Sequence, residues 1–113
     1  AKLANIDRFH VKCLERFMTR LKSAQEENHS LLDHTTIVYG SGMNNGERGG
    51  HLGTNLPLLV AGGKAHGYKH DQHLAHDPAK CPPLSNFLLT TIQKMGVEIG
   101  AFQDSSGTLT GIS

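Results

Sequence analysis

The stretch Leu56-Pro57-Leu58-Leu59-Val60-Ala61, closed by Gly62-Gly63, says more about the fold than any other part of this 113-residue chain. An apolar run without alternation is typical of a strand that is buried on both faces of a sheet. A second short strand is predicted over Thr35–Tyr39, where β-branched and aromatic residues end at Gly40. We therefore expect two neighbouring, parallel strands that belong to a larger sheet.

Two amphipathic helices are predicted, one before these strands and one after them. The first runs from Leu3 to about Asn28, with apolar residues at helical spacing and a largely charged opposite face. The second runs from Pro83 to Met95, and Gly96 lies just past its end. We interpret the apolar stripe of the first helix as a face that packs on the core, not one that binds a partner or a membrane.

Composition excludes several classes of function. The net charge is +1 with neutral histidines, so no basic surface for nucleic acid is indicated. No apolar stretch approaches the roughly 20 residues that a membrane-spanning helix needs. Residues 1–8 lack the apolar core of a signal peptide, which leaves a start further upstream or a cytosolic location open. Cys13 and Cys81 are interpreted as unpaired thiols or small core residues, although an oxidising compartment would allow them to pair.

Histidine is the unusual component, because seven of the eight histidines lie between His29 and His76. His51 is the strongest single candidate for a site residue, since the glycine-rich loop Gly40–Gly53 follows a strand and such loops often carry binding residues. In a functional interpretation, His51 is a metal ligand or an acid–base group. In the simpler interpretation, His51 is a solvent-exposed histidine in a loop.

A second group of histidines has separations that could suit a metal ion on a helix: His66, His70, His73 and His76. Gly67 and Pro78 argue that this segment is not helical. That weakens the helical geometry, but the residue types still suit a metal. The predicted metal ligands are His51, His73 and His70, for a divalent ion such as zinc. Two further groups of polar residues have structural roles as their simpler interpretation: Asn44, Asn45 and Glu47 in turns, and Asp7, Arg8 and His10 at a helix start.

The spacing of His51, Gly53 and Pro57, after the strand that ends at Tyr39-Gly40, resembles the late part of the alkaline phosphatase and sulfatase superfamily. In that superfamily one strand delivers an Asp-His pair to a two-metal site. The next strand is preceded by a His-x-Gly-x-x-x-Pro element, whose histidine is also a metal ligand in the phosphatases. The resemblance therefore implies a metal-ligand role for His51.

A narrower resemblance covers nearly the whole chain, to the bacterial secreted domain-of-unknown-function family 1552. The motifs that carry it stand here in the family's order: Ile6-Asp7-Arg8-Phe9-His10, Leu31-Leu32-Asp33, Tyr39-Gly40-Ser41-Gly42, Asn55 to Gly63, Gln72-His73-Leu74, Pro83-Leu84-Ser85-Asn86, Met95-Gly96-Val97 and Asp104-Ser105-Ser106-Gly107-Thr108-Leu109. Members of this family are several hundred residues long and usually begin with a twin-arginine export signal. The resemblance implies that residues 1–113 are the C-terminal segment of one domain of a periplasmic or secreted protein.

The implied fold is α/β: the C-terminal part of a three-layer αβα alkaline-phosphatase-like fold with parallel strands and two main helices. The rest of the sheet is expected from the remainder of the same protein or from a partner chain, because two strands alone leave open edges. The tail from Val97 to Ser113 is expected to contribute too few apolar residues to close them.

Departures from the superfamily pattern bear on function. Ser41, Gly42 and Met43 stand where the Asp-His ligands would lie, and they cannot form a stable oxygen and nitrogen shell around a hard divalent ion. Thr54 stands where the narrower family tends to have a second histidine. The first hypothesis that remains is a non-catalytic or catalytically altered cell-envelope protein with a binding or assembly role. The alternative is a metal-dependent hydrolase of phosphate or sulfate esters with a rebuilt metal site.

Overall fold

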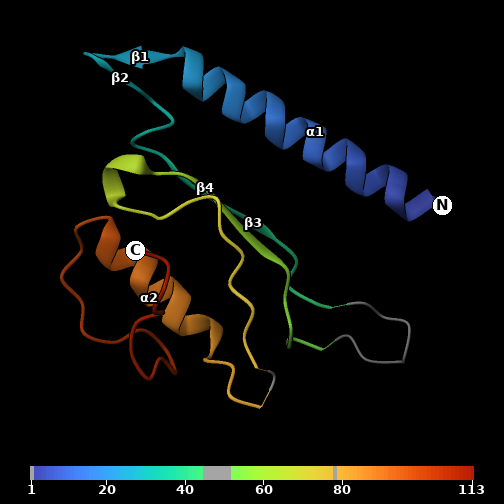
Figure 1. Ribbon diagram of the computed structural model, residues 1–113, viewed down its shortest axis with the longest axis vertical. Coiled ribbons are helices and arrows are strands. Elements are labelled where there is room, and N and C mark those ends of the chain that lie inside the picture. The colour runs from blue at the N-terminus through green and yellow to red at the C-terminus, as the bar shows by residue number, and fades with distance from the viewer. Residues whose placement is uncertain (1, 45–51, 78) are drawn as a thin grey trace.

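The computed structural model describes residues 2–44, 52–77 and 79–113 of the chain. The helices and strands are, in chain order, α1 (Lys2–Ser23), β1 (Gln25–Glu26), β2 (His29–Ser30), β3 (Thr36–Gly40), β4 (Leu58–Gly62), the short 3-10 helix η1 (Lys64–His66) and α2 (Leu84–Lys94) (Figure 1). The two main helices and the two main strands confirm the element types expected from the sequence.

The main sheet is an antiparallel hairpin of β3 and β4, in which Val38 lies opposite Val60. The expectation of parallel strands within a three-layer αβα fold is therefore wrong. Parallel neighbours need a crossover that carries the chain back to the starting edge, usually through a helix. Here β3 and β4 pair as antiparallel neighbours, which need no such crossover. The bond from Ser41 N–H to the Pro57 carbonyl, at 3.3 Å, continues the pairing beyond Gly40 and Leu58.

The burial of β4 also differs from the expectation of a strand covered on both faces. Ala61 is buried, but Leu58 and Leu59 are 41% and 47% exposed. Val60 packs against a small core formed by Tyr68, Phe87 and Ile112. The Ala61 end of β4 is thus covered, whereas its Leu58 end is exposed on both faces of the hairpin.

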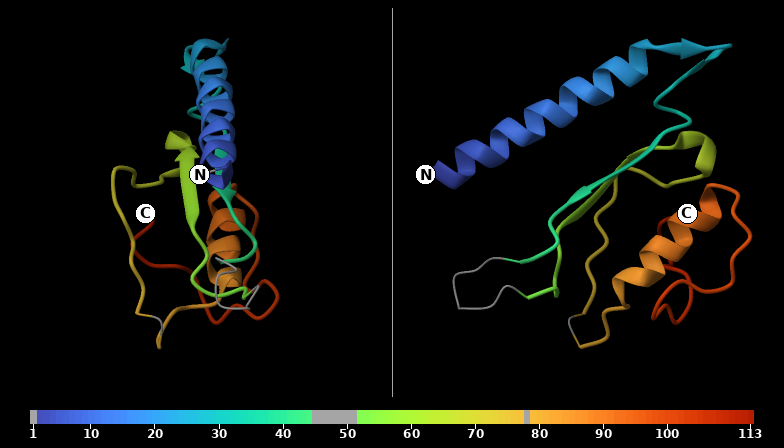
Figure 2. Two further views of the ribbon diagram at one scale, coloured as in Figure 1. Left: turned by 90° about the vertical axis from the view of Figure 1, so that its right-hand side faces the viewer. Right: turned by 180° about the vertical axis from the view of Figure 1, so that it is seen from behind.

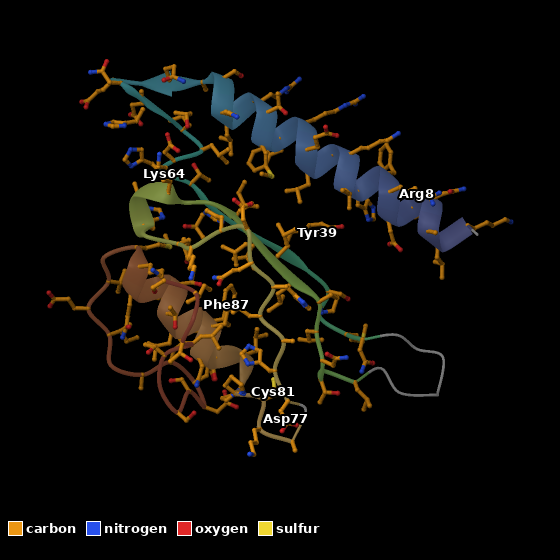
Figure 3. The ribbon with its side chains drawn as sticks, viewed as in Figure 1. Arg8, Tyr39, Lys64, Asp77, Cys81 and Phe87 are labelled. Atoms are coloured by element: carbon orange, nitrogen blue, oxygen red, sulfur yellow. The ribbon has the colours of Figure 1, made fainter. Side chains whose placement is uncertain are left out.

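Helix α2 supplies most of the buried side chains, including Phe87 and the fully buried Leu89. Figure 3 shows Phe87 on the side of α2 that faces the hairpin. Pro83 precedes the helix with an extended backbone, and Gly96, at a φ of 85°, follows its end. These are the positions at which proline and glycine favour the start and end of a helix, and the helix prediction is confirmed apart from one residue at each end.

The tail after α2 folds back over that helix instead of leaving the domain. Ile112 is 6% exposed and belongs to the core, and Leu109 packs against it. The Ile112 carbonyl accepts a bond from the Lys69 N–H at 3.1 Å. The sequence did not indicate that the tail would reach the core. Two apolar residues, Leu109 and Ile112, do so because polar groups hold the intervening chain against α2.

Helix α1 ends earlier than predicted, at Ser23 instead of near Asn28. The residues after it form the two-residue strands β1 and β2, which pair through Gln25 with Ser30 and Glu26 with His29. Glu27 has a φ of 54° and takes the chain through the turn between them. The periodicity of α1 continues weakly into this segment, but a left-handed residue cannot continue a right-handed helix.

Figure 1 shows the hairpin β3–β4 running between α1 and α2, and Figure 2 shows the same order from behind. α2 and the tail pack on one side of the hairpin. On the other side α1 diverges from it toward the N-terminus.

Candidate functional site

Helix α1 has 22 residues, and none of them is buried. Its large apolar side chains are strongly exposed, with Leu3 at 76%, Phe9 at 63% and Phe17 at 50%. An amphipathic helix of a globular protein normally buries such a stripe against a core. Because the apolar side chains of α1 are not buried, they form a surface that another polypeptide segment can cover.

The C-terminal end of α1 is the anchored end. The Leu31 N–H donates to the Ala24 carbonyl at 2.9 Å, and the Leu32 N–H donates to the Leu21 carbonyl at 3.3 Å. Leu21 itself is half-buried, whereas the apolar residues of the first turns are exposed. The helix is thus attached at one end and extends away from the domain at the other.

The hairpin presents a second apolar face. Side chains alternate between the two faces of a strand, so Ile37, Tyr39, Leu59 and Ala61 share the face opposite Val60. Since Val60 packs on the core beside α2, this second face is turned toward α1. Figure 3 shows Tyr39 projecting from β3 on that side. On this face Ala61 is buried, Ile37 and Tyr39 are half-buried and Leu59 is exposed. We call the exposed apolar residues of α1, together with Ile37, Tyr39 and Leu59, the open apolar surface.

The charge around this surface is unevenly distributed. Helix α1 contains six lysines and arginines but only two acidic residues, although the whole chain has a net charge of only +1. The basic residues alternate with the apolar ones at helical spacing and occupy the opposite side of α1. The open apolar surface therefore has a basic border along the helix.

The predicted metal ligands lie in two places. His51 lies outside the described residues. His70 and His73 are both exposed, and His70 Nε2 donates to the Gly62 carbonyl at 2.8 Å. Within residues 2–44, 52–77 and 79–113, no three His, Cys, Asp or Glu side chains gather as metal ligands would. Metal binding by His51, His70 and His73 stays a prediction.

His66 and Lys94 connect the turn after β4 to the rest of the domain. His66 Nδ1 lies 2.7 Å from the Thr36 hydroxyl on β3. Lys94 Nζ donates to the carbonyls of His66 and Gly67, at 3.3 and 2.8 Å, and lies 4.9 Å from the centre of the Tyr68 ring. These bonds attach the turn to both β3 and α2, so His66 has a structural role.

The residues at the empty ligand position form a turn of their own. Ser41 Oγ donates to the Met43 carbonyl at 2.7 Å and accepts from the Met43 N–H at 3.3 Å. Met43 is 51% exposed. The hydroxyl of Ser41 is thus already used on both sides by its neighbour, and it is not presented as a ligand or a nucleophile.

One carboxylate has a shifted pKa. The Ser30 hydroxyl donates to Asp33 at 2.9 Å, and this bond lowers the pKa of Asp33 below its usual value, helped by the Ser30 backbone, Lys64 and His34. Asp33 lies in the turn that links β2 to β3. The charge of Asp33 therefore helps to stabilise the turn between β2 and β3, and Asp33 is not part of a cluster of reactive groups.

Sequence reasoning missed a polar clasp between α2 and the tail. Asn86 Oδ1 accepts from the Ser106 N–H at 2.9 Å, and Asn86 Nδ2 donates to the Ser106 hydroxyl at 3.2 Å. Thr90 Oγ1 accepts from the Leu109 N–H at 2.7 Å. Asn86 and Thr90 are buried polar residues within a helical pattern, which is the signal that could have indicated partners for them.

The two cysteines, Cys13 and Cys81, are both free and exposed. Of the helices in the described part of the chain, none is both long and apolar enough to cross a membrane. Comparison with known proteins adds no relative: no protein-family model matches the chain, and neither a curated protein nor a solved structure does.

Proposed function

We propose that this chain acts by association with another polypeptide, as a binding or assembly part of a non-catalytic, periplasmic or secreted protein of the bacterial cell envelope. The proposal includes the periplasmic or secreted location. It also includes membership of domain-of-unknown-function family 1552, which the motifs of this chain resemble. The partner is the remainder of the same protein or a separate chain. The observation that carries the proposal is helix α1, whose apolar stripe has no buried residue.

The area exposed by the chain supports the proposal. A folded protein of 12.2 kDa is expected to expose about 6,100 Å². This chain exposes 8691 Å², roughly 2,600 Å² more than that scaling gives. One side of an obligate interface buries about 1,000 to 2,500 Å². The excess is therefore as large as the area that one partner contributes to a permanent complex.

The radius of gyration leads to the same inference. Its value is 15.9 Å, against about 13 Å for a compact domain of this length. The uncovered side chains are aromatic and aliphatic, which are the residues that contribute most to association when they are desolvated. The chain thus has the dimensions of a component that is completed by contact with another surface.

The non-catalytic part of the proposal rests on the turn at Ser41 to Met43. Its one hydroxyl is engaged within the turn, and its other two residues, Gly42 and Met43, carry no carboxylate or imidazole. The alternative, a metal-dependent hydrolase of phosphate or sulfate esters, depends on His51 and on sequence beyond these residues. No separate observation in the described residues favours it over association.

Site-specific photo-crosslinking tests the proposal. A photoreactive phenylalanine replaces Phe17, which is 50% exposed on the apolar side of α1. The matched control replaces Arg8, which is also exposed and lies on the opposite side of the same helix. In cells of the organism that produces the chain, the Phe17 position should give one defined polypeptide adduct, identified by mass spectrometry. The Arg8 position should give none, and equal labelling or no adduct would contradict the proposal.

A further inference from the structure

The outer edge of strand β3 is open. In an antiparallel pair, residues alternate between those whose backbone groups bond the partner strand and those whose groups point away. The bond from Ser41 N–H to the Pro57 carbonyl establishes which residues bond, because Ser41 and Pro57 are opposite each other. Two residues further, Tyr39 and Leu59 bond as well. Thr36, Val38 and Gly40 therefore direct their backbone N–H and C=O groups away from β4.

The outer edge of β4 is different, because the following chain covers part of it. Gly62 points its carbonyl outward by the same alternation, and His70 Nε2 donates to it at 2.8 Å. The segment after Tyr68 lies on the β4 side of the hairpin (Figure 2, left). For Thr36, Val38 and Gly40, no backbone partner outside β4 is found among the described residues. Val38 is also 43% exposed.

Proteins usually protect an exposed strand edge with lysine, proline, a bulge or a covering segment. The β3 sequence Thr36-Ile37-Val38-Tyr39-Gly40 contains no charged residue and no proline. It is β-branched and aromatic, so it has the composition of a strand inside a sheet. An edge of this kind is expected to be paired in the assembled protein.

From this edge we infer that two copies of the chain associate by pairing β3 with β3 of the second copy, in an antiparallel, four-stranded sheet. This inference rests on the proposed function and names the partner. A two-fold axis at Val38 places Val38 opposite Val38 of the second copy and Thr36 opposite Gly40. Thr36, Val38 and Gly40 then all lie in hydrogen-bonded pairs with the second copy, because their backbone N–H and C=O groups point outward. The edge is thus complementary to itself, as a two-fold interface requires.

The same symmetry bears on the open apolar surface. A two-fold axis perpendicular to the sheet keeps each face of the hairpin on its own side, so both copies of α1 lie over the same face of the wider sheet. Each α1 then has four strands to cover instead of two. A two-stranded hairpin alone is marginal in water, and a sheet of three or more strands with an apolar face is not. Pairing at β3 therefore gives α1 a surface on which its stripe can pack.

A disulfide at the symmetry axis tests the inference. The full chain, with Cys13→Ser and Cys81→Ser, receives Val38→Cys. In a hydrogen-bonded antiparallel pair the two Cα atoms are about 5.5 Å apart, within the range that a disulfide bridges. The control is Leu59→Cys, which is as exposed as Val38 but lies one strand further from the axis. Mild oxidation should link Val38→Cys chains into dimers and leave Leu59→Cys chains unlinked.

The association itself is measured by light scattering on the unmodified chain, which should have twice the mass of one 12.2 kDa chain. Val38→Pro removes the outward N–H without breaking a bond to β4, so it should abolish the dimer. Val38→Thr keeps that N–H and should retain it. A monomer at every concentration, or equal linkage at both cysteine positions, would overturn pairing at β3. If the Phe17 position still gives a polypeptide adduct in that case, the proposed function stands and only the second copy is excluded.

Discussion

Gly62 has a conformation and surroundings that together require glycine. Its φ is 68°, in the left-handed region that side chains disfavour. A Cβ placed there would overlap the Thr35 carbonyl oxygen and approach Leu32 Cδ1 to 2.9 Å. The end of β4 can therefore lie close to the segment before β3 only because this residue has no side chain.

Replacing Gly62 by alanine should lower the free energy of unfolding by at least about 1 to 2 kcal/mol, the cost of a left-handed conformation alone. Urea unfolding followed by circular dichroism measures the change. The control is Gly42→Ala, since Gly42 has no positive φ and no atom within 4 Å of its added Cβ. Equal effects of the two substitutions would show that the contact at Gly62 is unimportant.

Some of these residues could be predicted from the sequence and others could not. Gly62-Gly63 was expected to close a strand, and it does. His66, in contrast, was a candidate metal ligand by its spacing, yet it lies 2.7 Å from the Thr36 hydroxyl. Thirty positions separate the two residues, so no local pattern could indicate this pair.

At the scale of elements, the clasp between α2 and the tail explains why the last residues belong to the domain. Asn86 satisfies the backbone N–H and the hydroxyl of Ser106, and Thr90 satisfies the N–H of Leu109. These bonds direct the tail along α2 until Ile112 reaches the core. The sequence motifs that contain Asn86 and Ser106 are thus one structural unit.

Asn86→Ala should destabilise the chain by about 1 to 3 kcal/mol, because it leaves the Ser106 N–H without its acceptor next to a buried surface. Thermal or urea unfolding measures this loss. Ser106→Ala is the matched substitution: it removes the hydroxyl but keeps the backbone bond, so it should cost less. The clasp would be unimportant if Asn86→Ala left stability unchanged.

The direction of β4 could not be predicted from its own sequence. An apolar run fits a buried parallel strand and also an antiparallel strand with one covered face. What decides between them is where the chain returns, since parallel neighbours need a crossover and antiparallel neighbours do not. The two main helices and the two main strands were predictable because periodicity is local. The pairing was not, since it depends on where the chain returns.

For the whole molecule, the main feature is the contrast between its two helices. α1 has 22 residues and none buried, whereas α2 has 11 residues, of which five are buried. Tertiary packing contributes more to the stability of a helix in a protein than its length does. The longer helix is therefore expected to be the less stable one in a dilute solution of the chain.

Hydrogen exchange on the dilute chain should show faster exchange of the α1 amides than of the α2 amides, by about tenfold or more. Raising the concentration until the chain associates should slow exchange in α1 and β3 while α2 changes little. Peptide-level mass spectrometry gives both comparisons in one experiment. Equal protection of the two helices at low concentration would mean that α1 is covered within a single chain.

By itself the sequence determined which segments are helices and strands, where glycine and proline end them, and that the region of Ser41 to Met43 carries no metal-ligand pair. These properties depend on residues close together in the chain. Tertiary structure alone decided the antiparallel pairing of β3 with β4, the return of the tail to α2 and the exposure of the α1 stripe. Each of these depends on distant contacts, and an amphipathic pattern states that a face should be covered without stating what covers it.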